Sequence, residues 1–169
     1  ISLLLEKLDN AYRTASQLES QNGYPCFGVI PEVEKPGNEP IGDYILSKPA
    51  SNIAEAVRTL RMVLNLRSSD PEKRPKVVTI TSSLPSEGKT TLSSWMARLA
   101  AKSGEKVIVV VCDLRRPNIH NAFGKKSDTT IVEYLTGKAS LEEVIKKDDA
   151  SGAHVIYARS VPNNALDLI

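Results

Sequence analysis

Ser83-Leu-Pro-Ser-Glu-Gly-Lys-Thr90 follows a β-branched run, Val77–Thr81, and precedes a helical pattern of apolar residues from Thr91 to Ala101. Strand, tight loop, Gly-Lys-Thr and helix, in this order, predict a phosphate-binding loop. The backbone N–H groups of such a loop and of the helix start together form an anion site. Ser83 departs from the G-x-x-x-x-G-K-T pattern, because it stands in place of the first glycine. The alternative interpretation is an ordinary helix start with an exposed lysine.

The loop motif assigns roles to two of its side chains. Lys89 is expected to reach the β- and γ-phosphates as a point charge, and the Thr90 hydroxyl is expected to bind Mg²⁺. We therefore predict that the chain binds ATP or ADP together with Mg²⁺. The predicted nucleotide-binding residues are Ser83, Pro85, Glu87, Gly88, Lys89, Thr90 and Thr91.

The composition is typical of a soluble globular protein, with 41% hydrophobic and 25% charged residues in a chain of 169. The net charge of +2 gives no reason to expect binding to nucleic acid. The two cysteines, Cys26 and Cys112, form neither a disulfide framework nor a metal cluster, which favours a reducing, cytosolic compartment. No apolar run approaches the roughly 20 residues of a membrane span. The apolar start Ile1–Leu5 lacks a cationic leader, so we do not expect a signal peptide.

The first 50 residues differ in character from the rest of the chain. Apolar residues at helical spacing predict a helix over 3–20, and a short strand is expected over 27–30. Four prolines and two glycines in 31–50 indicate a linker or an extended arm. We accordingly divide the chain into an arm, 1–50, and the N-terminal part of a nucleotide-binding domain, 51–169.

Strands and helices alternate from residue 51 onward. Ser51 is expected to cap a helix that runs to about Arg67. Further predictions are strands over 76–82, 106–112 and 153–158, and helices over 89–103, 130–136 and 140–147. The predicted fold class is therefore α/β, with a doubly wound, mostly parallel sheet of the P-loop NTPase type. We expect this sheet to be incomplete and to carry an N-terminal helical or extended arm.

The strand 106–112 leads into a second group of charged residues, Asp113, Arg115 and Arg116. An acidic residue at the carboxyl end of a strand beside a phosphate loop can face Mg²⁺ and the γ-phosphate, and Asp113 has this position. The alternative is that Asp113 merely caps the following turn. The two arginines would either bind phosphate or a partner's carboxylates, or form a solvated basic turn.

With these motifs, the chain resembles the cytoplasmic domain of bacterial tyrosine kinases of the polysaccharide co-polymerase family. Thr81–Thr90 matches the family's Walker A motif, in which a serine at position 83 is usual. Asp113-Leu-Arg-Arg-Pro117 matches its second motif, Walker A′. Glu55-Ala-Val-Arg-Thr-Leu-Arg61 matches its E-x-x-R-x-x-R signature. Leu5–Asp9, with the later Gly28–Pro31, is similar to the segment that follows the family's second membrane helix, so residues 1–50 would be juxtamembrane.

The resemblance implies an ATP- and Mg²⁺-dependent tyrosine autokinase that regulates exopolysaccharide polymerisation and export. It implies that Lys89 and Asp113 are catalytic, and that Thr90 and Asp113 bind Mg²⁺. The signature residues Glu55, Arg58 and Arg61 would join copies of the chain in a ring. The other implied partners are the export machinery and the membrane, reached through segments upstream of Ile1. The implied location is the cytoplasmic side of the bacterial inner membrane.

Two departures from the family pattern bear on activity. Val111 stands where Walker A′ has its first Asp, a carboxylate that helps to organise Mg²⁺ and the attacking tyrosine hydroxyl, and a valine can do neither. Trp95 stands where the family usually has Asn. The Walker B strand and the C-terminal tyrosine cluster are expected only after Ile169. We therefore expect this chain, as it stands, to be inactive or nearly so.

Two alternative functions remain at this stage. One is a nucleotide-dependent assembly module that does not catalyse, which Val111 favours. The other is a deviant-Walker ATPase of the septum-placement or plasmid-partition class, against which the E-x-x-R-x-x-R helix argues.

Overall fold

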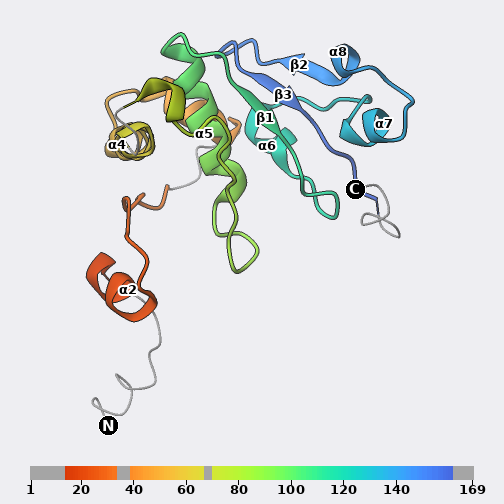
Figure 1. The fold of residues 1–169 in the computed structure, drawn as a ribbon. Coiled ribbons are helices and arrows are strands. Elements are labelled where there is room, and N and C mark those ends of the chain that lie inside the picture. The colour runs from red at the N-terminus through yellow and green to blue at the C-terminus, as the bar shows by residue number, and fades with distance from the viewer. Residues whose placement is uncertain (1–13, 34–38, 67–69, 162–169) are drawn as a thin grey trace.

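The computed structural model describes residues 14–33, 39–66 and 70–161. Figure 1 shows α5 between α4 and a small sheet, with α7 and α8 on the opposite side of the sheet from α4. The elements in chain order are α2 (Ala15–Asn22), η1 (Ile41–Asp43), α3 (Tyr44–Ser47), α4 (Asn52–Leu66), η2 (Pro71–Lys73), α5 (Lys89–Lys102), β1 (Ile108–Val110), α6 (Ile119–Phe123), α7 (Ile131–Leu135), α8 (Leu141–Val144), β2 (Ile145–Lys147) and β3 (His154–Ile156).

The sheet has the strand order β1-β3-β2. β1 runs parallel to β3 with Ile108 opposite His154, and β2 runs antiparallel to β3 with Ile145 opposite Ile156. A parallel pair needs a crossover connection, and the segment that carries α6, α7 and α8 supplies it. The described residues thus form an α/β fold with a small, mixed and incomplete sheet, which confirms the predicted fold class.

The predicted helix over 140–147 is only half correct. Its start is confirmed, because Ser140 and Glu143 form a reciprocal capping box at α8. Residues 145–147 are strand β2 instead of helix. The backbone N–H of Asp148 donates to Ala153 O at 2.7 Å and thereby closes a hairpin, so pairing with β3 outweighs the local helical preference.

Two predicted strands are not formed in the structure. Residues 76–82 are extended without strand pairing, and the side chains of Val77 and Val78 are 85% and 46% exposed. Residues 27–30 are likewise irregular. A strand persists only where its backbone groups pair with a neighbour, and among the described residues the three strands pair with one another. The predictions over 106–112 and 153–158 are confirmed in their central residues, as β1 and β3.

Part of the expected linker is folded into the core. Residues 41–47 form η1 and α3, and the side chain of Ile45 is completely buried. Gly42 lies so close to α6 that a Cβ atom there would stand 2.2 Å from the Ala122 carbonyl oxygen. The linker expectation is therefore wrong for this segment, because its apolar residues find a surface to cover between the flanking prolines.

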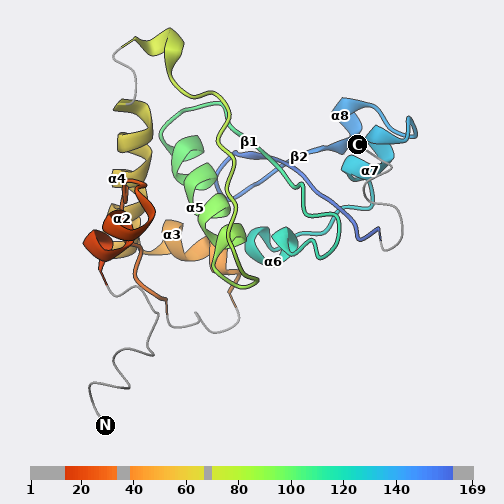
Figure 2. The ribbon, with the colours of Figure 1, turned by 60° about the horizontal axis from the view of Figure 1, so that its bottom comes forward.

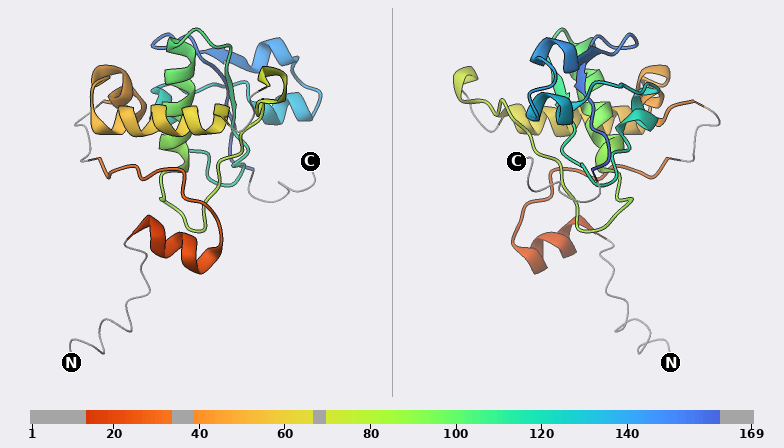
Figure 3. Two further views of the ribbon diagram at one scale, coloured as in Figure 1. Left: turned by 60° about the vertical axis from the view of Figure 1, so that its left-hand side comes forward. Right: turned by 90° about the vertical axis from the view of Figure 1, so that its right-hand side faces the viewer.

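α2 is the described part of the predicted helix over 3–20, of which residues 1–13 lie outside the description. Thr14 caps its start, and Gly23, with a φ of 69°, ends it. None of its residues is buried, and in Figures 1 and 3 it lies apart from the other helices. Among the described residues, no helix is both long and apolar enough to cross a membrane.

Two hydrophobic clusters form the core, and α5 contributes to the first and borders the second. The first lies between α3, α4 and α5, and the second lies between the sheet and α6; Figure 2 shows these helices side by side. The first cluster comprises Ile45, Ile53, Ala54, Val57, Trp95 and Leu99, and the second comprises Val111, Ile119, Ala122, Phe123, Val155 and Tyr157. The packing of α5 against both clusters fixes the position of its first turn, where the phosphate loop is predicted.

Arg98 on α5 anchors this arrangement. Its guanidinium is 1% exposed and contacts both carboxylate oxygens of Asp148, at 3.0 and 3.1 Å, as well as the carboxylate of Asp43. The same group lies 4.8 Å from the centre of the Phe123 ring. Trp95, one turn earlier, donates its Nε1–H to Ile41 O at 2.9 Å. These contacts tie η1 and the β2–β3 turn to α5.

Candidate nucleotide-binding site

The predicted phosphate loop makes a sharp turn into α5. α5 begins at Lys89, directly after Gly88, whose φ is 87°. A Cβ atom at Gly88 would meet nothing within 4 Å, so the left-handed backbone, and not crowding, calls for glycine here. Ser86 also has a positive φ, 65°, which is strained for a residue with a side chain. Because Gly88 has no side chain to cap the helix, N–H groups of the first turn remain available to an anion.

The loop also holds the ammonium group of Lys89. Its Nζ donates to Ser82 Oγ at 2.6 Å and approaches Leu84 O at 3.4 Å, while Ser82 Oγ donates to Leu84 O at 2.8 Å. The structure thus brings Lys89 onto the loop that precedes it. Sequence analysis did not single out Ser82. The feature that could have pointed to Ser82 is a hydroxyl side chain seven residues before Lys89, at the start of the loop.

Glu87 turns its carboxylate back onto the same loop, where Oε2 accepts a hydrogen bond from Leu84 N–H at 2.8 Å. This bond, together with the Ser82 hydroxyl, the Ser83 N–H and the charge of Lys89, holds the pKa of Glu87 below its ordinary value, although burial acts in the opposite direction. Glu87 is therefore a carboxylate at neutral pH.

The other predicted nucleotide-binding residues surround the turn. Thr90 and Thr91 are half-buried in the first turn of α5, and Ser83 and Pro85 are exposed on the loop. The side chains of these four residues take no part in the loop hydrogen bonds described above, and their roles toward a nucleotide stay predictions.

Asp113 follows β1, and Figure 1 shows its loop at the same end of the molecule as the phosphate loop. Its Oδ1 accepts the N–H groups of Arg115 and Arg116 at 3.2 and 2.9 Å, so the turn-capping role is present. Both bonds use one oxygen, which leaves Oδ2 for another contact. The side chains of Arg115 and Arg116 are exposed.

The residues around the loop fit a nucleotide with Mg²⁺ better than a metal alone. Among the described residues, no group of three or more His, Cys, Asp or Glu could hold a metal ion. Mg²⁺ usually binds proteins through one or two oxygen ligands and completes its shell with phosphates and water. A hydroxyl from Thr90 and a carboxylate from Asp113 match that requirement in chemistry.

Val111 is buried, with an exposed fraction of 8%, and packs in the second hydrophobic cluster. Its backbone N–H donates to Ile156 O at 3.1 Å and thereby extends the β1–β3 ladder by one residue. The position that would carry a carboxylate in the family pattern therefore supports the core in this chain.

The three signature residues of α4 differ in exposure. Arg58 pairs with Glu55 at 3.0 Å, and their side chains are 40% and 73% exposed. Arg61 is only 14% exposed, because its guanidinium binds Glu105 at 2.6 Å beyond the end of α5. Arg61 is therefore largely covered within the chain, whereas Glu55 and Arg58 are more accessible.

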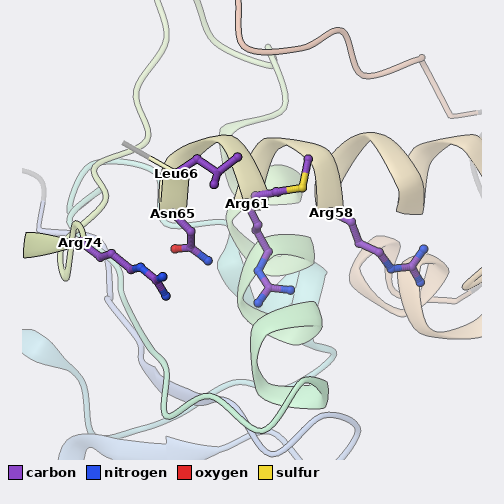
Figure 4. A pocket seen from close by; sticks show the side chains of 6 residues that line it. Arg58, Arg61, Asn65, Leu66 and Arg74 are labelled. Carbon is purple, nitrogen blue, oxygen red and sulfur yellow. The ribbon is translucent and has the colours of Figure 1, made fainter. Parts of the chain in front are cut away.

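A shallow cleft of about 270 Å³ adjoins these residues. Figure 4 shows that Arg58, Arg61 and Asn65 extend from the same side of α4 and that Arg74 approaches from the following segment. The remaining lining residues are Met62 and Leu66, which are 55% and 71% exposed.

Comparison with known proteins identifies the family, although no family model matches the chain. Tyrosine-protein kinase etk of Escherichia coli K12 is 36% identical over 124 residues, which cover 73% of this chain and 17% of that protein. A putative tyrosine-protein kinase in the cps region of Klebsiella pneumoniae is 32% identical over 121 residues, which cover 72% and 16%. This chain therefore spans less than a fifth of the length of these two relatives.

The solved kinase domain of Escherichia coli ETK superposes with a TM-score of 0.81 at 31% sequence identity. The match covers 94% of this chain and 64% of the solved domain. Sequence and structure agree on the resemblance first drawn from the Walker motifs and the α4 signature. The chain belongs to the bacterial tyrosine-protein kinases and corresponds to part of their kinase domain.

Proposed function

We propose that this chain is the ATP- and Mg²⁺-binding part of a tyrosine autokinase that regulates exopolysaccharide polymerisation and export. By family it is a protein-tyrosine kinase. The observation that carries the nucleotide site is the loop before α5, where Gly88 leaves N–H groups uncapped and Lys89 lies on the loop. Anionic phosphate is the ligand class that such a site binds best.

Phosphoryl transfer asks a protein mainly to position its reactants and to neutralise developing charge. Lys89 would leave Ser82 and pair with the β- and γ-phosphates. Thr90 and Asp113 would hold Mg²⁺, which supplies positive charge beside the transferred group. The bonds from Arg115 and Arg116 to Oδ1 of Asp113 would keep its carboxylate oriented, with Oδ2 toward the metal.

Assembly and location form a second part of the proposal. Glu55 and Arg58 would contact another copy of the chain in a ring, with Arg61 behind them. Both outer residues are accessible on α4, beside the exposed Met62 and Leu66. Arginine and methionine are enriched in protein interfaces. The chain would operate at the cytoplasmic side of the inner membrane with the export machinery, in keeping with the cps region named for one relative.

A second candidate function is a nucleotide-dependent assembly module that does not catalyse. The burial of Val111 favours it, because the second cluster has an apolar side chain where the family pattern has a carboxylate.

Substitution of the loop lysine tests the nucleotide site. Lys89→Ala should weaken ADP or ATP binding at least about tenfold, or ~1.4 kcal/mol, because it removes the loop's cation. Isothermal titration calorimetry on the purified chain provides the measurement. Lys102→Ala is the matched control, since Lys102 is an exposed lysine at the other end of the same helix. Equal affinities of the parent and Lys89→Ala would refute the phosphate-loop assignment.

A further inference from the structure

Glu87 contacts the loop to which it belongs. It is the only acidic residue among positions 82–91, and its carboxylate turns back onto the loop while the residue stays exposed to solvent. The left-handed backbone of Ser86, directly before it, allows the chain to fold back at this point. Glu87 Oε2 then accepts Leu84 N–H at 2.8 Å, three residues upstream.

The groups around this carboxylate are of the kind that bind phosphate. They are the Leu84 N–H, which donates to the carboxylate, and the ammonium of Lys89, whose charge acts on the carboxylate while its Nζ donates to Ser82 Oγ at 2.6 Å. A nucleotide phosphate seeks loop N–H groups and the lysine for the same electrostatic reason. Two anions cannot share these donors without repulsion, so the Glu87 carboxylate and a phosphate group compete for them.

We propose that Glu87 is an internal anion that occupies part of the phosphate site and must swing away before nucleotide binds. This inference rests on the proposed nucleotide site. It assigns Glu87 a role opposite to that of an ordinary binding residue, because its charge lowers nucleotide affinity. The contact also keeps the loop folded in the absence of ligand, since it satisfies a donor that would otherwise need water. The lowered pKa of Glu87 agrees with a carboxylate that is ionised across the neutral range.

The proposal is tested by removing the charge while keeping the shape. Glu87→Gln retains the length of the side chain, and its amide oxygen can still accept Leu84 N–H. ADP and inorganic pyrophosphate, titrated by calorimetry without Mg²⁺, should both bind about threefold more tightly or better, because a charge repulsion is lost. Adenosine affinity should not change, since adenosine carries no phosphate. Glu32→Gln, which removes an exposed acid outside the loop, should leave all three affinities unchanged.

The outcomes distinguish a failure of the internal-anion proposal from a failure of the proposed nucleotide site. If ADP binds the parent and Lys89→Ala abolishes binding, but Glu87→Gln binds ADP equally or more weakly, the internal-anion proposal is wrong and the nucleotide site stands. If the parent does not bind ADP, both fall. Circular dichroism establishes that each variant is folded. The amide resonance of Leu84 provides a direct second readout, because ADP should shift it in the parent as the Glu87 contact breaks. An unshifted resonance in the ADP-bound parent would overturn the proposal.

Discussion

Glu133 shows how single residues hold the segments around the sheet. It occupies the third position of α7, where its Oε2 accepts both the Thr130 N–H at 2.9 Å and the Thr130 hydroxyl at 2.5 Å. Its other oxygen accepts Arg159 Nε–H, beyond β3, at 2.7 Å. Burial by itself raises the pKa of Glu133, but the hydrogen bonds from Thr130 and Arg159 outweigh it and lower the pKa to about 2.

The pH dependence of the unfolding free energy should show the contribution of the Glu133 carboxylate. The pKa of Glu133 is lower in the folded chain than its ordinary value of 4.5, so its stabilising contribution is complete above pH 4.5 and is lost as the pH falls toward 2. Glu133→Gln should cost about 1 kcal/mol at pH 7, because it weakens a helix cap, and should flatten the acid limb of the stability curve. Urea unfolding from pH 7 to pH 2.5 measures both effects. The control is Glu142→Gln, an exposed residue of α8. A Glu133→Gln curve parallel to that of the parent at every pH would contradict the assignment.

α4 illustrates how one element serves both the core and the surface. Its buried residues Ile53, Ala54 and Val57 pack on α3 and α5, and Arg58 and Met62 remain accessible. Arg61 belongs to neither group, because its ion pair with Glu105 ties the helix to the turn after α5. Arg58 and Arg61 must therefore be replaced one at a time when assembly is tested.

Arg58→Ala and Arg61→Ala should have different effects. Arg58→Ala should lower the unfolding free energy by less than about 1 kcal/mol, because it removes an exposed ion pair with Glu55, which contributes little, and a hydrogen bond to Pro49 O. It should shift the sedimentation profile toward monomer if α4 joins copies of the chain. Arg61→Ala should lower stability by about 1 kcal/mol, because it removes a mostly buried charge-assisted hydrogen bond. Lys138→Ala, which removes an exposed cation far from α4 in the sequence, serves as the control. An unchanged mass distribution for Arg58→Ala, at concentrations where the parent assembles, would leave Arg58 as a solvated surface residue.

At the scale of the whole molecule, α5 connects the candidate site to both hydrophobic clusters. Arg98 holds Asp43 of η1 and Asp148 before β3 to the middle of the helix whose first turn carries the phosphate loop. Next to this anchored part, residues 76–82 have no partner strand among the described residues, and β1 exposes Ile108 and Val110 at 45% and 46%. The candidate nucleotide site is thus anchored from one side, through α5, while residues 76–82, which lead into the loop, are not held by strand pairing.

The chain as given should transfer little or no phosphate. Val111 provides no carboxylate for Mg²⁺, and loss of one group that stabilises the transferring charge can cost on the order of 10²–10³ in rate. Incubation with radiolabelled ATP and Mg²⁺ should give no more label than Lys89→Ala, even on the exposed Tyr24 and Tyr134. Val111→Asp should not restore transfer in this chain and should destabilise it by a few kcal/mol (~2–4), because it buries a charge in the second cluster. Label on the parent well above the Lys89→Ala background would refute this expectation.

The sequence alone was sufficient wherever the signal is local. The Gly-Lys-Thr turn, the α4 and α5 helices, the capping box at Ser140 and the family resemblance depend on residues a few positions apart, whose chemistry constrains the chain directly. Features that depend on distant partners required the tertiary structure. Residues 145–147 form a strand because β3 lies beside them. Residues 76–82 do not form a strand, because no described strand pairs with them. Residues 41–47 are folded because α5 and α6 offer them an apolar surface. The burial of Arg61 and of Val111 has the same origin, since a side chain's exposure is set by what packs over it, and that neighbour is far away in the sequence.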